Sequence, residues 1–184
     1  MERVLICCES DTASARIEEL LAGSYETVRA RLPAEAREKA EDASAAVLAV
    51  PLRQDWADAV RALSLDTCAG LIALLRGERR AEAEKLFGGL GVAFADAAEG
   101  KKAFFAALAC AAKVHERLRA VRSENDRLKS TIGDLKLVDR AKCALIQYLN
   151  MTEADAHRFI EKQAMNRRLS RREIALEILK AYES

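Results

Sequence analysis

Short apolar runs alternate with helix-like segments over the N-terminal half of the chain, and this alternation is the strongest constraint on the fold. Three of the runs, RVLICC, AAVLAV and GLIALL, contain almost no polar residue. Runs of this kind are typical of strands covered on both faces. The predicted strands are residues 3–8, 25–30, 45–50, 70–75 and 91–95, and the predicted helices between them are residues 11–21, 34–41, 56–63 and 79–87. This order predicts βαβ units, and therefore an α/β flavodoxin-like domain with a parallel sheet over residues 1–112.

The count and spacing of these units resemble the receiver domain of two-component response regulators. A working receiver holds Mg²⁺ with acids that follow the first strand, and it accepts a phosphoryl group on an Asp that ends the third. The positions that carry a receiver's functional residues are occupied here by Cys8 and Glu9, by Val50 and Pro51, by Leu75 and Arg76, and by Asp96 and Ala97. At most one acid of the metal-binding pair remains, and the third strand does not end in Asp. The resemblance therefore implies a pseudo-receiver, and we expect neither a metal site nor regulation by aspartyl phosphorylation.

A heptad pattern follows this domain, on a helix that we expect to begin near Lys101. Its a positions are Ala111, Leu118, Asn125 and Ile132, and its d positions are Val114, Val121, Leu128 and Leu135. An Asn at an a position fixes the register of a coiled coil and favours a parallel dimer. We therefore predict a coiled-coil homodimer over residues 113–138, held by Leu118, Val121, Asn125, Leu128, Ile132 and Leu135. The alternative is one long helix that packs on its own domains.

Three amphipathic helical segments make up residues 139–184 and predict a C-terminal three-helix bundle. The first continues the long helix and turns Val138, Ala141, Leu145 and Leu149 inward. Thr152 with Asp155, and Ser170 with Glu173, form the pattern in which a hydroxyl and a carboxylate satisfy free N–H groups at a helix start. The inward residues of the second and third segments are Ala156, Phe159, Ile160, Ala164, Ile174, Ala175, Ile178, Leu179 and Tyr182.

Positive charge is concentrated in this last third of the chain. The net charge of the whole chain is +1, but residues 140–184 carry nine basic and six acidic side chains. NRRLSRR, at residues 166–172, holds four arginines and no acid. Such a run is usually a solvated loop, but a module that binds polyanions also needs one.

Several segments of this region together resemble the ANTAR domain, found in RNA-binding transcription antitermination regulators. They are the AK pair at residues 141–142, NMTEADAHRFI at 150–160, AMNRRLS at 164–170 and IALEIL at 174–179. The family places this module after a coiled coil and a receiver-like domain, which is the order predicted here. The resemblance implies an RNA-binding surface made of Lys142, His157, Arg158, Lys162, Met165, Asn166, Arg167, Arg168 and Arg171.

Other classes of function find little support in the sequence. The five cysteines form no C-x-x-C pair and lie mostly in apolar runs, so we expect reduced core thiols in a cytoplasmic protein. We expect no membrane span, because no apolar segment is long enough. The two histidines, His115 and His157, have no nucleophile and acid placed around them. We therefore expect no catalytic residues, no cofactor and no enzyme activity.

These patterns lead to one interpretation and two alternatives. The interpretation is a dimeric antiterminator that binds hairpin loops in an mRNA leader, with a regulatory protein or ligand acting on the pseudo-receiver. One alternative is a DNA-binding transcriptional regulator that uses the three helices as a helix-turn-helix. Glu173 and Glu177 in the would-be recognition helix argue against it, because they would repel phosphates. The other alternative is a scaffold whose pseudo-receiver docks another protein.

Overall fold

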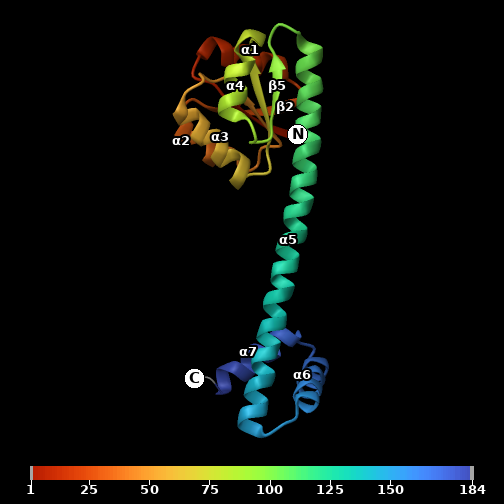
Figure 1. Cartoon of the computed structure of the whole chain (residues 1–184). Helices are drawn as coiled ribbons and strands as arrows, with labels where there is room; N and C mark the ends of the chain where they lie inside the picture. Colours follow the sequence, from red (N-terminus) through yellow and green to blue (C-terminus); the bar gives the residue numbers. More distant parts are fainter. Residues whose placement is uncertain (1, 183–184) are drawn as a thin grey trace. The chain divides into compact units, whose positions relative to one another are not determined.

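A five-stranded parallel sheet forms the centre of the N-terminal part of the chain in the computed structural model, which describes residues 2–182 (Figure 1). Its strands are β1 (Glu2–Cys7), β2 (Tyr25–Ala30), β3 (Ala45–Leu48), β4 (Gly70–Leu75) and β5 (Val92–Asp96). They lie in the order β2-β1-β3-β4-β5, and every neighbouring pair is parallel. This is the predicted flavodoxin-like order, and all five predicted strands are present within two residues of their expected ends.

Helices cover both faces of the sheet, because its strand residues are apolar on both faces. The helices are α1 (Asp11–Leu21), α2 (Pro33–Lys39), α3 (Gln54–Asp66), the short η1 (Gly77–Arg79), α4 (Arg80–Phe87) and the start of α5 (Lys101–Leu149). Leu5 and Cys7 of β1 belong to the core that includes residues of α2, α3 and α4. Val4 and Ile6 belong to the opposite core, with residues of α1 and α5. The two cores follow from the alternation of side chains along each strand.

The start of α5 packs tightly on this sheet. A Cβ atom added to Gly70 of β4 would lie 2.2 Å from the carbonyl oxygen of Ala111, so only glycine allows this approach. His115 Nδ1 lies 2.9 Å from the carbonyl oxygen of Cys68. Ala111 is 4% exposed and is part of the core. Ala111 takes the first a position of the heptad pattern, but it is covered within its own chain and lies before the coiled coil predicted for residues 113–138.

The chain divides between Val121 and Arg122 into two compact units, which we call the N-terminal and the C-terminal unit. The C-terminal unit contains the end of α5 with α6 (Glu153–Arg167) and α7 (Arg171–Tyr182). Its core confirms the predicted three-helix bundle and consists of Ala141, Ala144, Leu145, Ala156, Ile160, Ala164, Ile174, Ala175, Ile178 and Leu179. Leu149, which we expected inside, is 44% exposed. The helix ends there, and Asn150 turns the chain with φ of 52°.

The burial of the cysteines agrees only in part with the prediction from the sequence. All five are free thiols, and Cys7 and Cys8 are buried. Burial, with a smaller effect of the neighbouring Cys8, raises the pKa of the Cys7 thiol to about 12, so this thiol stays protonated. Cys110 and Cys143 are exposed, which corrects the expectation that the cysteines are mostly core residues. Within residues 2–182, none of the helices combines the length and the apolar character that a membrane span requires.

Candidate nucleic-acid interface

The position of α6 is fixed by its capped start and its buried face. The Thr152 hydroxyl accepts a hydrogen bond from the Asp155 N–H (3.1 Å), which confirms its predicted capping role, and donates one to the Asp155 carboxylate (2.6 Å). Ala156, Ile160 and Ala164 point into the bundle and are at most 8% exposed. Because a helix has one buried stripe here, the residues between these positions must face solvent.

The exposed face of α6 gathers five of the predicted RNA-contacting residues. His157, Arg158, Lys162 and Met165 are all exposed on this helix, and Asn166 follows them on its last turn. Met165 is 79% exposed, more than any other large apolar side chain in residues 2–182. An apolar side chain so exposed among cations gives this surface both a charged and a non-polar component.

The turn between α6 and α7 is held in an uncommon conformation. Arg168 caps α6 in the left-handed region, with φ of 54° and ψ of 37°. Its N–H donates to the carbonyl of Met165, and the N–H of Leu169 donates to the carbonyl of Ala164 at 3.0 Å. Glycine is the usual residue at this position, because a Cβ atom is disfavoured there. An arginine at this position adds an exposed cation to the turn at a cost in backbone strain.

α7 begins with the second predicted capping pair. The Ser170 N–H and hydroxyl both donate to the Glu173 carboxylate at 2.7 Å, and the Glu173 N–H donates back to the hydroxyl at 3.2 Å. The Ser170 backbone N–H, and then its hydroxyl, hold the pKa of Glu173 below its ordinary value. Glu173 is therefore a capping residue, and its carboxylate is held by hydrogen bonds at the N-terminus of α7.

Acidic residues pair with much of the arginine cluster, which the sequence run alone did not reveal. Arg167 donates to Glu177 of α7 through both terminal nitrogens, one of them at 2.8 Å. This hydrogen bonding lowers the pKa of the Glu177 carboxyl group. Arg172 pairs with Asp134 on α5, which lies 38 positions earlier in the chain. These arginines link the helices of the bundle as well as carrying charge.

Glu161 lies inside the predicted RNA-binding surface and was missed from the sequence. It is 3.3 Å from His157 Nε2 and 3.4 Å from an Arg171 nitrogen. Glu161, Met165 and Arg171, with Ala164, Leu169 and Ser170, also line a shallow depression. Only the spacing of four residues from His157 to Glu161 could have indicated this contact from sequence.

Two cations of the predicted surface stand without an acidic partner. Within the described part of the chain, no carboxylate lies within 4.0 Å of Lys162 or Arg168. Arg158, in contrast, pairs with Asp155 at 3.1 Å. The uncompensated positive charge of this surface therefore lies on α6 and at its C-terminal cap.

Lys142 occupies a different environment from the other predicted RNA contacts. Its side chain is 15% exposed, and its ammonium group lies 2.9 Å from Asp139 and 3.1 Å from Glu153. The hydrogen bonds that this ammonium group donates to Asp139 and, with a smaller effect, to Glu153 raise the pKa of Lys142. Lys142 therefore connects α5 to the first residue of α6, and a role in RNA binding would require one of these acids to release it.

The predicted dimer residues form an exposed stripe on α5. Leu118, Val121, Leu128, Ile132 and Leu135 are between 44% and 61% exposed, and Asn125 is exposed among them. From Leu118 to Leu135 the stripe continues for about five helical turns, and each of its apolar side chains remains at least 44% exposed. Exposed apolar stripes of this regularity are typical of helix-to-helix association.

The carboxyl edge of the N-terminal sheet does not fit the metal site of a receiver. The loop between β1 and α1 offers one carboxylate, Glu9, which accepts hydrogen bonds from Arg53 (2.7 Å) and from the Trp56 indole (2.7 Å). β3 is followed by Ala49, Val50 and Pro51, which offer no side-chain oxygen. Among residues 2–182, no cluster of His, Cys, Asp and Glu could hold a metal ion. Mg²⁺ prefers oxygen ligands, and among residues 8–10 and 49–51 only Glu9 offers a carboxylate.

Comparison with known families and structures agrees with this geometry. Residues 126–179 match the ANTAR domain. Among solved structures, the response regulator StyR aligns with a TM-score of 0.57 and 11% identity, covering 99% of this chain and 100% of its own. No curated protein sequence matches the chain.

Two further structures align with the N-terminal part. The adenylate cyclase from Rhodopirellula baltica has a TM-score of 0.57 and 16% identity, covering 70% of this chain and 97% of its own. The signal receiver domain of an HD domain-containing protein from Pseudomonas fluorescens Pf-5 has a TM-score of 0.57 and 15% identity, covering 65% and 92%. At these identities the likeness establishes the fold alone.

Proposed function

We propose that this chain, which carries an ANTAR domain behind a unit with the receiver fold, is a dimeric antiterminator that binds hairpin loops of nascent mRNA. The observation that carries the proposal is the exposed face of α6 with its C-terminal cap, where Lys162 and Arg168 have no acidic partner among residues 2–182 and Met165 is 79% exposed. Such a surface offers cations for phosphates and an apolar side chain for bases.

Loops suit this surface better than duplexes. The deep major groove of an RNA helix closes its base edges to side chains, whereas loop bases can be splayed out and stacked. In the proposed complex, Lys162 and Arg168 hold loop phosphates, and His157 and Met165 contact base faces. Arg167 and Arg171 join them by exchanging Glu177 and Glu161 for phosphate. Exposed ion pairs contribute only about 0–1 kcal/mol, so this exchange costs little.

Dimerisation follows from the exposed stripe on α5. In a parallel coiled coil, Leu118, Val121, Leu128, Ile132 and Leu135 would be buried against the same residues of a second copy. Asn125 would pair with the partner's Asn125 and fix the register. Two ANTAR domains at fixed spacing would then bind two hairpin loops of one transcript, and the second loop would bind at high effective concentration. Antitermination results because the bound RNA fold excludes the terminator.

We further propose that aspartyl phosphorylation does not control this activity. A phosphoryl acceptor and a metal-binding acid pair are both absent from the carboxyl ends of β1 and β3 within the described chain, and Glu9 is taken by Arg53 and Trp56. Control would then come from a protein or ligand that binds the N-terminal unit. Uptake of phosphate from acetyl phosphate onto this unit would contradict the proposal.

A mobility-shift titration tests the RNA-binding part. The full chain is titrated against a tandem-hairpin RNA, the same RNA with scrambled loops, and a DNA duplex of equal length. We expect tight binding to the intact hairpins only, and weaker binding after Lys162→Gln. Arg61→Gln, an exposed arginine of α3, is the matched control and should bind as the unmodified chain does. Equal binding to all three nucleic acids, lost together as salt rises, would leave only nonspecific attraction to polyanions.

A further inference from the structure

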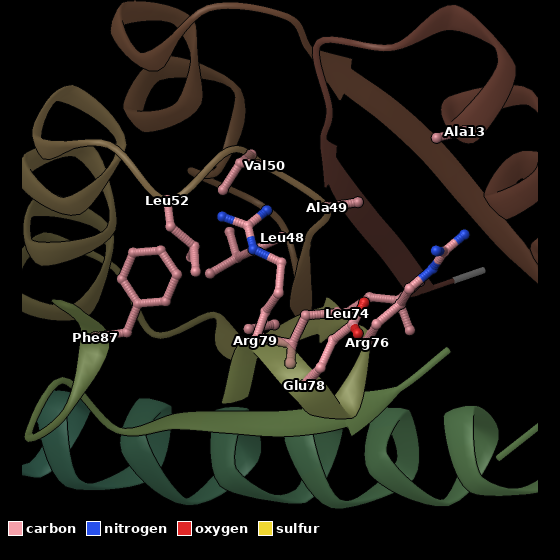
Figure 2. A pocket seen from close by; sticks show the side chains of 12 residues that line it. Ala13, Leu48, Ala49, Val50, Leu52, Leu74, Arg76, Glu78, Arg79 and Phe87 are labelled. Carbon is pink, nitrogen blue, oxygen red and sulfur yellow. The ribbon is translucent and has the colours of Figure 1, made fainter. Parts of the chain in front are cut away.

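A pocket of about 510 Å³ opens at the carboxyl ends of β3 and β4 in the N-terminal unit (Figure 2). Its floor and wall are apolar, made chiefly by Leu48, Val50, Leu52 and Phe87. Leu48 and Phe87 are at most 2% exposed, so they are fixed parts of the core and present only a small surface to the pocket. This volume lies within the range of small-molecule sites, about 300–1,000 Å³.

The position of the pocket is one where open α/β sheets bind ligands. In such sheets, ligands bind beyond the carboxyl ends of the strands. In this chain one acid, Glu9, remains after β1 and pairs with Arg53 and Trp56, whereas Val50 and Arg76 stand at two of the positions that carry a receiver's functional residues. The part of the edge around β3 and β4 therefore presents apolar side chains and two arginines with one acid, Glu78, a lining that favours an anion over a metal cation.

Two arginines and one acid make up the charged part of the lining. Figure 2 shows the Arg79 side chain reaching across the apolar floor toward Leu48 and Val50, whereas Arg76 points away from it. Within the described chain, no carboxylate lies within 4.0 Å of Arg76. Glu78 is the acid of the lining, so the charged residues of the pocket sum to a single positive charge.

The Arg79 guanidinium can change partner at low cost. It pairs with Glu82 on the first turn of α4 at 3.2 Å, and both side chains are about half exposed. Ion pairs at such exposure contribute about 0–1 kcal/mol, so a better-placed anion can replace the carboxylate. A guanidinium also matches carboxylate and phosphate oxygens with two parallel hydrogen bonds.

From this arrangement we propose that the pocket binds a small organic anion, in which a carboxylate or phosphate is attached to an apolar body. The apolar body lies against Leu52, Phe87 and Val50, and the acidic group is held by Arg79, with Arg76 as a second cation. The site rests on the N-terminal unit alone and goes beyond RNA binding. The suggestion that the bound anion controls RNA binding rests on the proposed function, in which aspartyl phosphorylation has no role. The binding of the anion can be tested without RNA.

Binding of simple probes to the full chain tests the site. Benzoate and phenyl phosphate carry both features, benzyl alcohol lacks the charge, and inorganic phosphate lacks the apolar body. We expect a saturable change in the backbone amide NMR signals of residues 48–52 and 76–79 with at least one of the aromatic anions. The affinities for benzyl alcohol and for inorganic phosphate should be lower by at least about tenfold, since each of these probes loses one part of the interaction. Absence of saturable binding by both aromatic anions, or equal binding of benzyl alcohol, would overturn the proposal.

Three variants separate the contributions of charge and shape. Arg79→Gln is at an exposed position, should leave the fold intact, and should weaken the aromatic anion by about tenfold. Leu52→Trp fills the apolar part and should abolish binding while both arginines remain. Arg61→Gln on α3 removes an arginine outside the pocket and should change nothing. Unchanged affinity in Arg79→Gln, or in a folded Leu52→Trp chain, would show that the probe binds elsewhere and would refute the site.

Discussion

Replacing Arg168 with glycine separates the charge of this residue from its role in the turn. Arg168 holds φ of 54° and ψ of 37°, a conformation that disfavours any residue with a Cβ atom. Relief of this strain should stabilise the C-terminal unit by about 0.5–1 kcal/mol. For a domain of this size, a change of 1 kcal/mol corresponds to about 4–8 °C in Tm, so we expect a rise of a few degrees.

The same substitution should weaken RNA binding, because it removes a cation that has no acidic partner in the described chain. Loss of one phosphate contact to single-stranded RNA should lower the slope of log K against log salt by about 0.7. Thermal unfolding followed by circular dichroism gives the stability change, and hairpin-RNA titrations at several salt concentrations give the slope. The predicted variant is thus more stable than the original chain and binds RNA less tightly.

Asn150→Gly provides the matched control for this experiment. Asn150 has φ of 52°, nearly the same backbone conformation, but carries no charge and precedes α6. Its stability gain should be smaller, since Asn tolerates this region better than Arg does, and its RNA affinity should not change. Undiminished RNA affinity in Arg168→Gly would refute the assigned role of the turn. Equal losses in both variants would show that turn flexibility, not charge, controls binding.

Three further predictions follow from the contacts of the two units. In a denaturant titration, Gly70→Ala should destabilise the N-terminal unit by about 1–3 kcal/mol, because its Cβ would meet the Ala111 carbonyl oxygen at 2.2 Å. Gly133→Ala is the control: no atom lies within 4 Å of its new Cβ, so it should be neutral or stabilising in the same titration. The C-terminal unit should lose stability as pH falls below the ordinary Glu pKa of about 4.3, because the folded pKa values of Glu173 and Glu177 lie lower still and their stabilisation disappears once both are protonated. Glu177→Gln should flatten that acid-side decline, and an unchanged decline would contradict the assignment. Leu128→Glu places two negative charges opposite each other in the proposed coiled-coil interface and should convert dimer to monomer in analytical ultracentrifugation. Arg127→Glu, which lies beside the interface, should leave the dimer intact. A dimer that survives Leu128→Glu would exclude the coiled-coil interface.

The elements that the sequence predicted correctly depend on local patterns. The strand Gly70–Leu75 is a continuous apolar run, and the Thr152 and Ser170 caps are read from residues three positions apart. Hydrophobic periodicity likewise identified the buried faces of α6 and α7. These patterns are reliable because the residues that form them are close together in the sequence.

The features that escaped prediction depend on residues that are distant in the sequence. The pairing of Arg172 with Asp134 joins residues 38 positions apart, and the link from Trp56 to Glu9 joins residues 47 apart. Ala111 fits a heptad by spacing, but it is covered by the sheet because Gly70 allows the helix to approach. The sequence therefore identified the basic surface, whereas only the structure distinguishes its paired arginines from Lys162 and Arg168.

Photo-crosslinking tests the central claim, that the exposed face of α6 contacts the bases of an RNA loop. A hairpin RNA with 4-thiouridine in its loop is bound to the full chain and irradiated, and the crosslinked peptides are identified by mass spectrometry. We expect crosslinks within residues 157–168, which include His157 and Met165, and their loss when the label is moved to the stem. Crosslinks confined to α7 or to the N-terminal unit would contradict it.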